Sequence, residues 1–316
     1  MTYFLRRLLY AVPIAIGVTI ICFALIYLGP VEPLDAVAPD DASPEELARL
    51  KVEYGFDKPL PVQYLIWLSR AMAGDFGVSL FTRRPVLDEL LPAIANTMTL
   101  AMVATGFAFT IAFALGILAA YNNGRILDRL FTGVAVVGVS IPNYWLSIVL
   151  IIIFAVELNM LPAMGMGPTG SRDWAWDIAH LRHMVLPAIA ISAIPVGIIT
   201  RTTRACILEM LSQEFVSALH AKGISRARVL VHVVRNAAPT VLAATGIQFG
   251  HLLGGSILVE TVFSWPGTGY LLNEAIFKRD LPVLQATIAV LALFFVVINL
   301  VVDLVQTWLD PRIKRA

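Results

Sequence analysis

Few side chains in this 316-residue sequence have the type and spacing that a chemical site requires. His180 and His183 stand three residues apart and could hold a metal ion, but no cysteine accompanies them, so we predict no metal site. Cys22 and Cys206 lie within or beside apolar runs and show neither metal-type nor disulfide-type spacing. His251 stands alone in another apolar run, where a histidine is more often a hydrogen-bonded interior residue than a ligand. These residues predict neither a metal centre nor a catalytic centre.

Motifs for hydrolysis are also absent from the sequence. In a nucleotide-binding phosphate loop, Ser or Thr directly follows the lysine. The five lysines of this chain are followed by Val, Pro, Gly, Arg and Arg, in the order Lys51, Lys58, Lys222, Lys278 and Lys314. Neither Gly-x-Ser-x-Gly nor His-Glu-x-x-His occurs. We therefore expect that the chain is not an enzyme and that any energy it uses comes from other proteins.

The composition places this polypeptide in a membrane. Hydrophobic residues make up 58% of the chain and charged residues 14%, and the mean hydropathy is +0.79, whereas about a quarter of a soluble chain is charged. A soluble fold cannot bury so much apolar side chain, but a bilayer can accommodate it. The formal net charge of +1 provides no basic excess to displace counterions from phosphates, so we expect no nucleic-acid partner.

Six apolar runs predict an all-α polytopic membrane protein with six transmembrane helices. A helix needs about 20 residues to cross the hydrocarbon layer, and the fourth run is shorter and carries Pro187 and Pro195. Proline is tolerated in a membrane helix where neighbours or water satisfy the freed carbonyl groups. None of the runs contains Lys or Arg; they are Leu8–Leu28, Met98–Tyr121, Leu130–Val156, Val185–Thr200, Val241–Val259 and Val283–Val302.

The distribution of basic residues predicts that both termini are cytoplasmic. The N-terminus, the 122–129 turn, the 201–240 loop and the C-terminal tail hold 2, 2, 6 and 3 basic residues. The short loops 157–184 and 260–282 on the opposite side hold two each. The remaining six lie in the long 29–97 segment, which exceeds the length over which the positive-inside rule is reliable.

The predicted organisation is therefore an N-terminus and first helix over residues 1–28, a large periplasmic loop over 29–97, and a five-helix core over 98–316. The periplasmic loop is mildly acidic, with 11 acids against six bases. Ser43-Pro44-Glu45-Glu46 predicts a capped helix that stops at Gly55, and Pro61–Ala73 predicts a second helix. The loop is either a decoration that packs on the outer ends of the helices or a platform for an external partner.

The basic 201–240 segment predicts two short helices around a glycine. Ser212 can cap the first helix, which ends at Gly223, and Ser225 can cap the second. Such a segment can simply fix topology, bind nucleic acid or dock a cytoplasmic protein, and the modest charge disfavours nucleic acid. Because the chain has no nucleotide-hydrolysis motif, we expect an energy-supplying partner protein to bind at this helix pair.

Strings of residues along the whole chain resemble one known family. The chain is similar to permease subunits of the bacterial ABC importers for di- and oligopeptides, specifically the first-permease, or B-type, branch. The resemblance extends over both predicted faces of the membrane. It rests on Phe4–Leu8, Tyr54–Tyr64, Gly74–Ser79, Arg84–Val86, Ser140–Leu146, Leu161–Ala163, Glu260–Gly267 and Leu309–Arg312.

The resemblance also implies where ATPases would act. The inner loop is similar to the EAA loop of such permeases, whose coupling helix sits in a cleft of the ATPase. The pattern falls on Ser217-Ala218-Leu219-x-x-x-Gly223, with Ser217 in place of the usual glutamate, whose charge Glu209 or Glu214 could supply. The implied coupling residues are Glu214, Phe215, Ser217, Ala218, Leu219, Lys222 and Gly223. The implied periplasmic family motif comprises Glu260, Phe263, Trp265, Pro266 and Gly267.

By this resemblance, the fold is that of an ABC type I importer permease in the bacterial inner membrane. The implied partners are a second homologous permease, two ATP-binding subunits and a periplasmic or lipid-anchored solute-binding protein. ATP and magnesium would be bound by the ATPases, with no cofactor in this chain. The permeases would form a path for di- or oligopeptides and open it by alternating access.

Two alternatives remain open from the sequence. Relatives of this architecture carry nickel chelates, glutathione or oligosaccharides, and nothing in the apolar runs excludes such cargo. A remoter alternative is an ATPase-independent channel or an ion-coupled carrier, which predicts inverted repeats or an intramembrane ion site. The only acids near membrane depth are Glu260 and Asp303, each at the end of a run, and they do not form a carboxylate relay.

Overall fold

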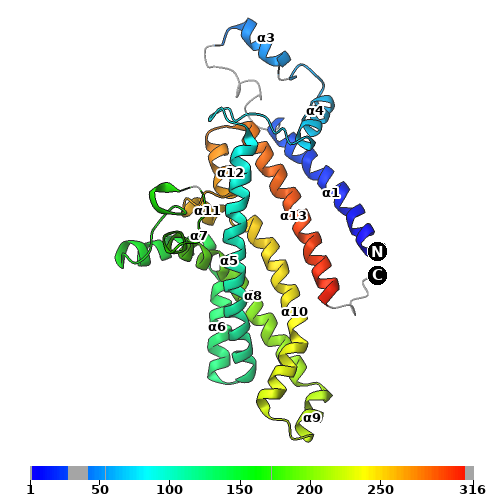
Figure 1. Ribbon diagram of the computed structural model, residues 1–316, viewed down its shortest axis with the longest axis vertical. Helices are drawn as coiled ribbons and strands as arrows, with labels where there is room; N and C mark the ends of the chain where they lie inside the picture. The colour runs from blue at the N-terminus through cyan, green and yellow to red at the C-terminus, as the bar shows by residue number, and fades with distance from the viewer. Residues whose placement is uncertain (1, 28–41, 54, 172, 310–316) are drawn as a thin grey trace. The chain divides into compact units, whose positions relative to one another are not determined.

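The computed structural model describes residues 2–27, 42–53, 55–171 and 173–309. These residues are almost entirely helical, and the only β-type pairing among them is an isolated bridge between Val78 and Pro85. Figure 1 labels the α-helices. The elements in chain order are α1 (Thr2–Tyr27), α3 (Pro44–Glu53), α4 (Leu60–Met72), α5 (Val86–Tyr121), α6 (Ile126–Ser140), α7 (Asn143–Leu150), the π-helix η1 (Ile151–Glu157), the 3-10 turn η2 (Pro168–Gly170), α8 (Ile178–Leu211), α9 (Glu214–Ala221), α10 (Arg226–Gly255), α11 (Ile257–Val262), α12 (Thr268–Phe277) and α13 (Leu281–Leu309).

Several helices have the length and apolarity that a bilayer requires. Among the described residues these are α5, α8 and the Leu281–Val302 part of α13, and a fourth span is possible if α6 and α7–η1 together form one bent span. Helix α1 contributes a shorter apolar stretch, Val12–Ala24, which does not reach the length of these spans. A helix satisfies its backbone hydrogen bonds internally, which is why an apolar chain in lipid folds into helices. The protein is a multi-pass membrane protein. Four residues of the strings that resemble the permease family, Tyr54, Asp310, Pro311 and Arg312, lie outside the described residues, as does Leu28 at the end of the first apolar run.

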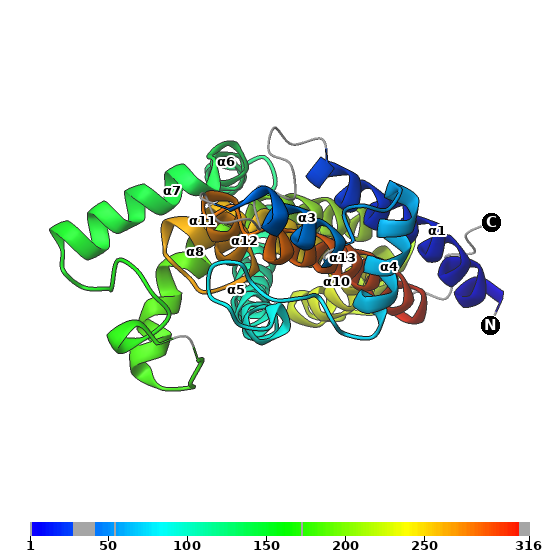
Figure 2. The same ribbon diagram turned by 90° about the horizontal axis from the view of Figure 1, so that it is seen from above.

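The third and fourth apolar runs fold differently from the sequence prediction. The third run breaks after Ser140, where Ile141 and Pro142 separate α6 from α7 and the chain bends by 103°. Figure 2 shows α7 leading away from α6 as a result. The fourth run belongs to a helix of 34 residues that continues through Pro187 and Pro195, so its 16 apolar residues underestimate the helix length.

The described chain forms two compact units, each built from two separate segments of the sequence. The first unit comprises Met1–Thr97 with Pro266–Leu300, and the second comprises Met98–Trp265 with Val301–Ala316. Both α5 and α13 therefore contribute to both units.

A buried carboxylate organises the first unit. Asp280 is 4% exposed; it accepts hydrogen bonds from the Ser79 hydroxyl and from the backbone N–H of Leu80, 3.2 Å away. It also lies 3.4 Å from the backbone nitrogen of Val283 in the first turn of α13. A carboxylate at a helix N-terminus satisfies donors that have no partner within the helix. Asp280 thus ties the 79–81 turn to the start of α13.

The helices predicted in the long loop are present in this unit. The Ser43 hydroxyl accepts a hydrogen bond from the Glu46 backbone N–H at 3.2 Å, which confirms the predicted cap of α3. After α3, Gly55 adopts a left-handed conformation with a φ of 73°. The second predicted helix is α4, which contacts α1 through Tyr64, whose hydroxyl lies 2.9 Å from that of Thr19. The local signals in this segment were sufficient to locate both helices.

Small residues hold the helices of the second unit close together. A Cβ atom added to Gly197 of α8 would lie 2.2 Å from the carbonyl oxygen of Ala135 in α6. A Cβ atom on Gly138 of α6 would lie 2.9 Å from the carbonyl oxygen of Ala193 in α8. On the other side, a Cβ atom on Gly116 of α5 would lie 2.5 Å from the Thr203 Cβ. Because lipid tails are as apolar as the helix surfaces, the hydrophobic effect does not drive helices together inside a membrane. Close backbone approach at small residues is then a main source of packing energy.

This packing predicts that Gly197→Ala destabilises the second unit. The new methyl group would meet a backbone oxygen that cannot turn aside, and overpacking of this kind costs about 1–3 kcal/mol. The measurement is the apparent melting temperature of the detergent-solubilised protein. Gly133→Ala on α6 is the matched control because no atom lies within 4 Å of its added Cβ. Equal melting temperatures for the two variants would contradict the close approach.

Candidate functional site

The predicted coupling residues form the short helix α9 and the turn after it. Its N-cap position is Gln213, and Gly223 follows the helix with a φ of 74°. The Gly223 backbone N–H donates to the His220 carbonyl at 2.9 Å. The left-handed conformation explains why glycine suits this turn, since a side chain there would be strained. The predicted stop at Gly223 is consistent with this geometry.

The predicted cap at Ser212 is wrong. Ser212 terminates α8, and its hydroxyl donates to the Glu209 carbonyl at 2.8 Å. The segment is also not a pair of short helices, because the helix that follows Ser225 continues for 30 residues as α10. Ser225 indicated where the second helix begins, but not that this helix runs on into the fifth apolar run. As a result α9 is connected on both sides to a long helix.

The apolar side of α9 packs against the ends of α8 and α10. Val216 is 5% exposed and lies in a cluster with Ile207 of α8 and with Val229 and Val233 of α10. The predicted residues Phe215 and Leu219 are partly buried against the same cluster. Figure 1 shows α9 at the end of the long α8 and α10 helices. A force on α9 would therefore reach both helices through packed side chains.

The opposite side of α9 is open. The other predicted coupling residues are exposed, namely Glu214, Ser217, Ala218, Lys222 and Gly223. The predicted set thus divides by burial into two groups. Phe215 and Leu219 join α9 to its own chain, whereas the exposed residues form a surface with one acid, one base and small side chains.

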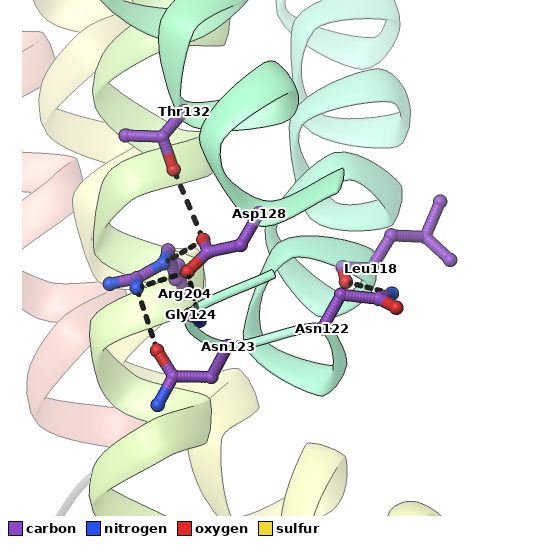
Figure 3. Close-up of polar contacts among 7 residues, drawn as sticks. All are labelled: Leu118, Asn122, Asn123, Gly124, Asp128, Thr132 and Arg204. Carbon is purple, nitrogen blue, oxygen red and sulfur yellow. Dashed lines mark hydrogen bonds and ion pairs between the residues drawn. The ribbon is translucent and has the colours of Figure 1, made fainter. Parts of the chain in front are cut away.

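An ion pair between α6 and α8, near the connection of α5 to α6, forms a second feature of this region (Figure 3). The Arg204 guanidinium donates from Nε to Oδ1 of Asp128 at 2.6 Å and from Nη2 to Oδ2 at 2.8 Å. Nη2 also donates to Oδ1 of Asn123 at 3.0 Å. The carboxylate further accepts from the Gly124 backbone N–H at 2.9 Å and from the Thr132 hydroxyl at 3.4 Å. We call this set of residues the clamp.

The clamp fixes α8 to the α5–α6 turn a short distance before α9. The Asp128 side chain is 8% exposed and that of Arg204 is 28% exposed, so the pair is partly shielded from water. Two parallel N–H···O contacts orient a guanidinium more strictly than a single contact does. Sequence reasoning missed both residues. Their only signal was the presence of opposite charges at the ends of two neighbouring apolar runs, and 75 intervening residues gave no reason to pair them.

The predicted periplasmic motif is largely buried rather than displayed. Glu260, Phe263 and Trp265 are 0%, 1% and 0% exposed in the second unit, and the Trp265 backbone N–H donates to the Glu260 carbonyl at 2.8 Å. Pro266 and Gly267 belong to the first unit, where the Pro266 carbonyl accepts from Asn96 at 2.9 Å and Gly267 precedes α12. These contacts indicate a structural role for most of the motif.

The histidines show no metal site. Among the described residues, no three His, Cys, Asp or Glu side chains are grouped to hold a metal ion. Instead, Asp177 caps α8 and accepts hydrogen bonds from the backbone N–H and the ring of His180, both at 2.8 Å. These donors hold the pKa of the Asp177 carboxyl below its ordinary value. The expectation for His251 is wrong, because its side chain is exposed and not an interior residue.

Comparison with known proteins identifies the family. Residues 112–315 match the family described as binding-protein-dependent transport system inner membrane component, and residues 1–101 match the N-terminal part described for such membrane components. The chain belongs to this permease family. It is 39% identical to the dipeptide transport system permease protein DppB of Alkalihalophilus pseudofirmus, covering 99% of both chains. It is 38% identical to DppB of Escherichia coli K12, covering 99% of this chain and 98% of that protein.

A solved structure supports the fold of the permease. An inward-facing structure of the MetNI methionine ABC transporter includes a chain similar to this one, with a TM-score of 0.57 and 18% identity. The similarity covers 70% of the permease and 96% of the MetNI chain. At this identity the likeness concerns the fold alone, and it confirms the predicted ABC type I permease architecture.

The clamp predicts a specific pattern of stability in the permease. Asp128→Ala should lower the free energy of unfolding by about 1.5–3 kcal/mol, since a hydrogen bond to a charged group contributes about this much to stability. The doubly exchanged variant Asp128→Arg with Arg204→Asp should recover part of the loss. Thermal denaturation in detergent measures both effects.

The matched control is an exposed ion pair. Lys278 and Glu274 pair one turn apart in the first unit, with side chains 35% and 38% exposed. Glu274→Ala should cost less than about 1 kcal/mol because solvent screens such pairs. If Asp128→Ala is no more harmful than Glu274→Ala, the clamp does not stabilise the second unit.

Proposed function

We propose that this chain is the permease subunit of an ATP-driven importer for di- and oligopeptides. The observation that carries the proposal is the identity of 38–39% to dipeptide permeases over 99% of this chain. The geometry of α9 supports the proposal, because a permease that does not hydrolyse ATP itself needs an exposed surface to which an ATPase can bind. The subunit itself is not an enzyme and holds no cofactor. ATP and magnesium are bound by two partner ATPases.

The proposed arrangement in the membrane follows the distribution of basic residues. Six helices cross the bacterial inner membrane, both termini and the 201–240 loop are cytoplasmic, and the 29–97 loop is periplasmic. A second homologous permease completes the path, and a periplasmic or lipid-anchored solute-binding protein delivers cargo to the outer face. The burial of Glu260, Phe263 and Trp265 suits them to hold the outer end of the core together. The exposed surfaces of the periplasmic loops then contact the solute-binding protein.

The proposed mechanism is alternating access driven through α9. Closure of the ATPases on ATP moves α9, whose Val216 is buried against Ile207 of α8 and Val229 of α10. Packed helices shift as bodies rather than deform continuously, so α8 and α10 move with α9. The clamp joins α8 to the α5–α6 turn, which brings α5 and α6 into the same movement. The helices then reopen the path toward the binding protein.

Cargo other than peptide is the main alternative. Nickel chelates, glutathione and oligosaccharides suit the same architecture, and the solute-binding protein selects among them. Binding assays of the cognate binding protein against these ligands discriminate the cargo. Selective binding of a non-peptide ligand, with no affinity for dipeptides, would contradict the proposed substrate class.

The exposed side of α9 gives a direct prediction. Ala218→Arg should abolish assembly of the permease with its ATPases or reduce ATP-driven uptake at least tenfold. The reason is that a long, charged arginine side chain would occupy a surface that now carries a methyl group. The permease should still fold, since Ala218 is exposed. Ile126→Arg, at the first residue of α6, which is 83% exposed, is the control and should retain assembly and uptake. Equal retention by both variants would remove α9 from the coupling site.

Reconstitution tests the dependence on partners. Proteoliposomes that contain both permeases, both ATPases and the binding protein should accumulate a labelled dipeptide only with ATP. This chain alone should accumulate none. Uptake by the purified chain without ATPases would favour a channel or ion-coupled carrier instead.

A further inference from the structure

One face of α10 is exposed or partly exposed among the described residues and carries polar and small side chains together with the apolar Ile247. The face follows the helical spacing i, i+4, i+7, i+11, i+15 and i+18, which places its members along one side of the helix. Five of the six are exposed and Ala243 is partly exposed. We call this face the α10 stripe; it comprises Asn236, Thr240, Ala243, Ile247, His251 and Gly254.

The α10 stripe begins where the contact with α9 ends. Val229 and Val233 lie on the same side of α10, two turns and one turn earlier, and are 2% and 0% exposed because the α9 cluster covers them. From Asn236 onward the same side is open. A movement of α9 therefore acts on the helix side that carries the stripe.

The chemistry of the α10 stripe does not suit a lipid environment. His251 is the only His, Lys, Arg, Asp or Glu in the six apolar runs, and groups of this kind at membrane depth face a protein interior or a water-filled cavity. Its ring makes no hydrogen bond to any other residue that the structure describes. From residue 241 to the end of α10, the exposed residue on the opposite side is the apolar Leu242, at 39% exposure. The two sides of the helix thus prefer different surroundings.

The apolarity of the whole helix points the same way. With 30 residues, α10 is long enough to cross a bilayer. Over its described residues it nevertheless falls outside the helices that are apolar enough to do so, unlike α5, α8 and α13. A helix whose polar face lines water inside an assembly can be less apolar than a helix surrounded by lipid.

We propose that the α10 stripe lines the aqueous path and hydrogen-bonds the backbone of the passing peptide. This inference rests on the proposed function. Asn236, Thr240 and His251 each offer a donor and an acceptor without a fixed charge in the neutral form. Such groups match peptide amides, which every cargo shares, and do not select a side-chain charge. The small residues Ala243 and Gly254 leave room beside these polar groups.

Cysteine accessibility in the assembled importer tests where the α10 stripe faces. Cys22 and Cys206 are first replaced by alanine, and single cysteines are introduced as Thr240→Cys and His251→Cys. The probe is a membrane-impermeant, positively charged methanethiosulfonate reagent. Both positions should react at least tenfold faster than Leu242→Cys, the control on the opposite side, and saturating dipeptide should slow them. Rates equal to that of Leu242→Cys would overturn the inference, as would a dry contact with the second permease that leaves both positions unreactive.

Uptake by two variants of His251 tests the hydrogen-bonding role. His251→Leu should lower dipeptide uptake about tenfold, the effect of losing one hydrogen bond of about 1.4 kcal/mol. His251→Gln keeps a donor and an acceptor and should stay within about threefold of the unaltered importer. Equal uptake by the two variants would overturn the hydrogen-bonding role.

The design separates this inference from the proposed function. If the unaltered importer takes up dipeptide but the accessibility pattern is absent, the inference fails and the function stands. If the importer takes up no dipeptide while Thr240→Cys and His251→Cys react rapidly, the peptide cargo is wrong and the path assignment stands without a peptide ligand.

Discussion

The apolar contact of α9 with α8 and α10 is the interaction on which the structure of this permease depends. Val216 lies against Ile207 and Val229, so the short helix is part of the same packed body as the two long helices beside it. Without this contact α9 would be held only by the short segments that join it to α8 and α10. A displacement of α9 would then change the conformation of those segments and would not move the long helices. With this contact, a partner protein that binds the exposed side of α9 can move α8 and α10 together with it.

Two further features extend this packed body across the second unit. The close approach of Gly197 to Ala135 and of Gly138 to Ala193 fixes α6 against α8 over their length. The clamp fixes the ends of the same helices by pairing Asp128 with Arg204. The first is a dispersion contact that needs small residues, and the second is a charged contact that needs a partly shielded site. Together they join α6 and the α5–α6 turn to α8 in one packed body.

Sequence reasoning predicted the class of the protein and most of the local structure. Apolar runs predicted helices, the Ser43 motif predicted the start of α3, and Gly223 predicted the end of α9. These signals are local, because caps and turns depend on a few neighbouring residues. The pairing of Asp128 with Arg204 could not be predicted, because it joins residues that are distant in the chain. The continuation of α8 through two prolines depends on packing by other helices, which no local pattern encodes.

The most direct test of the account is a crosslink from α9 within the assembled importer. A photoreactive amino acid at Ser217, which is exposed on α9, should capture an ATP-binding subunit on irradiation, and the same group at Leu242 should not. Capture of the external solute-binding protein from Ser217, or no adduct in an importer that still hydrolyses ATP and transports, would contradict the claim that work enters the permease through α9.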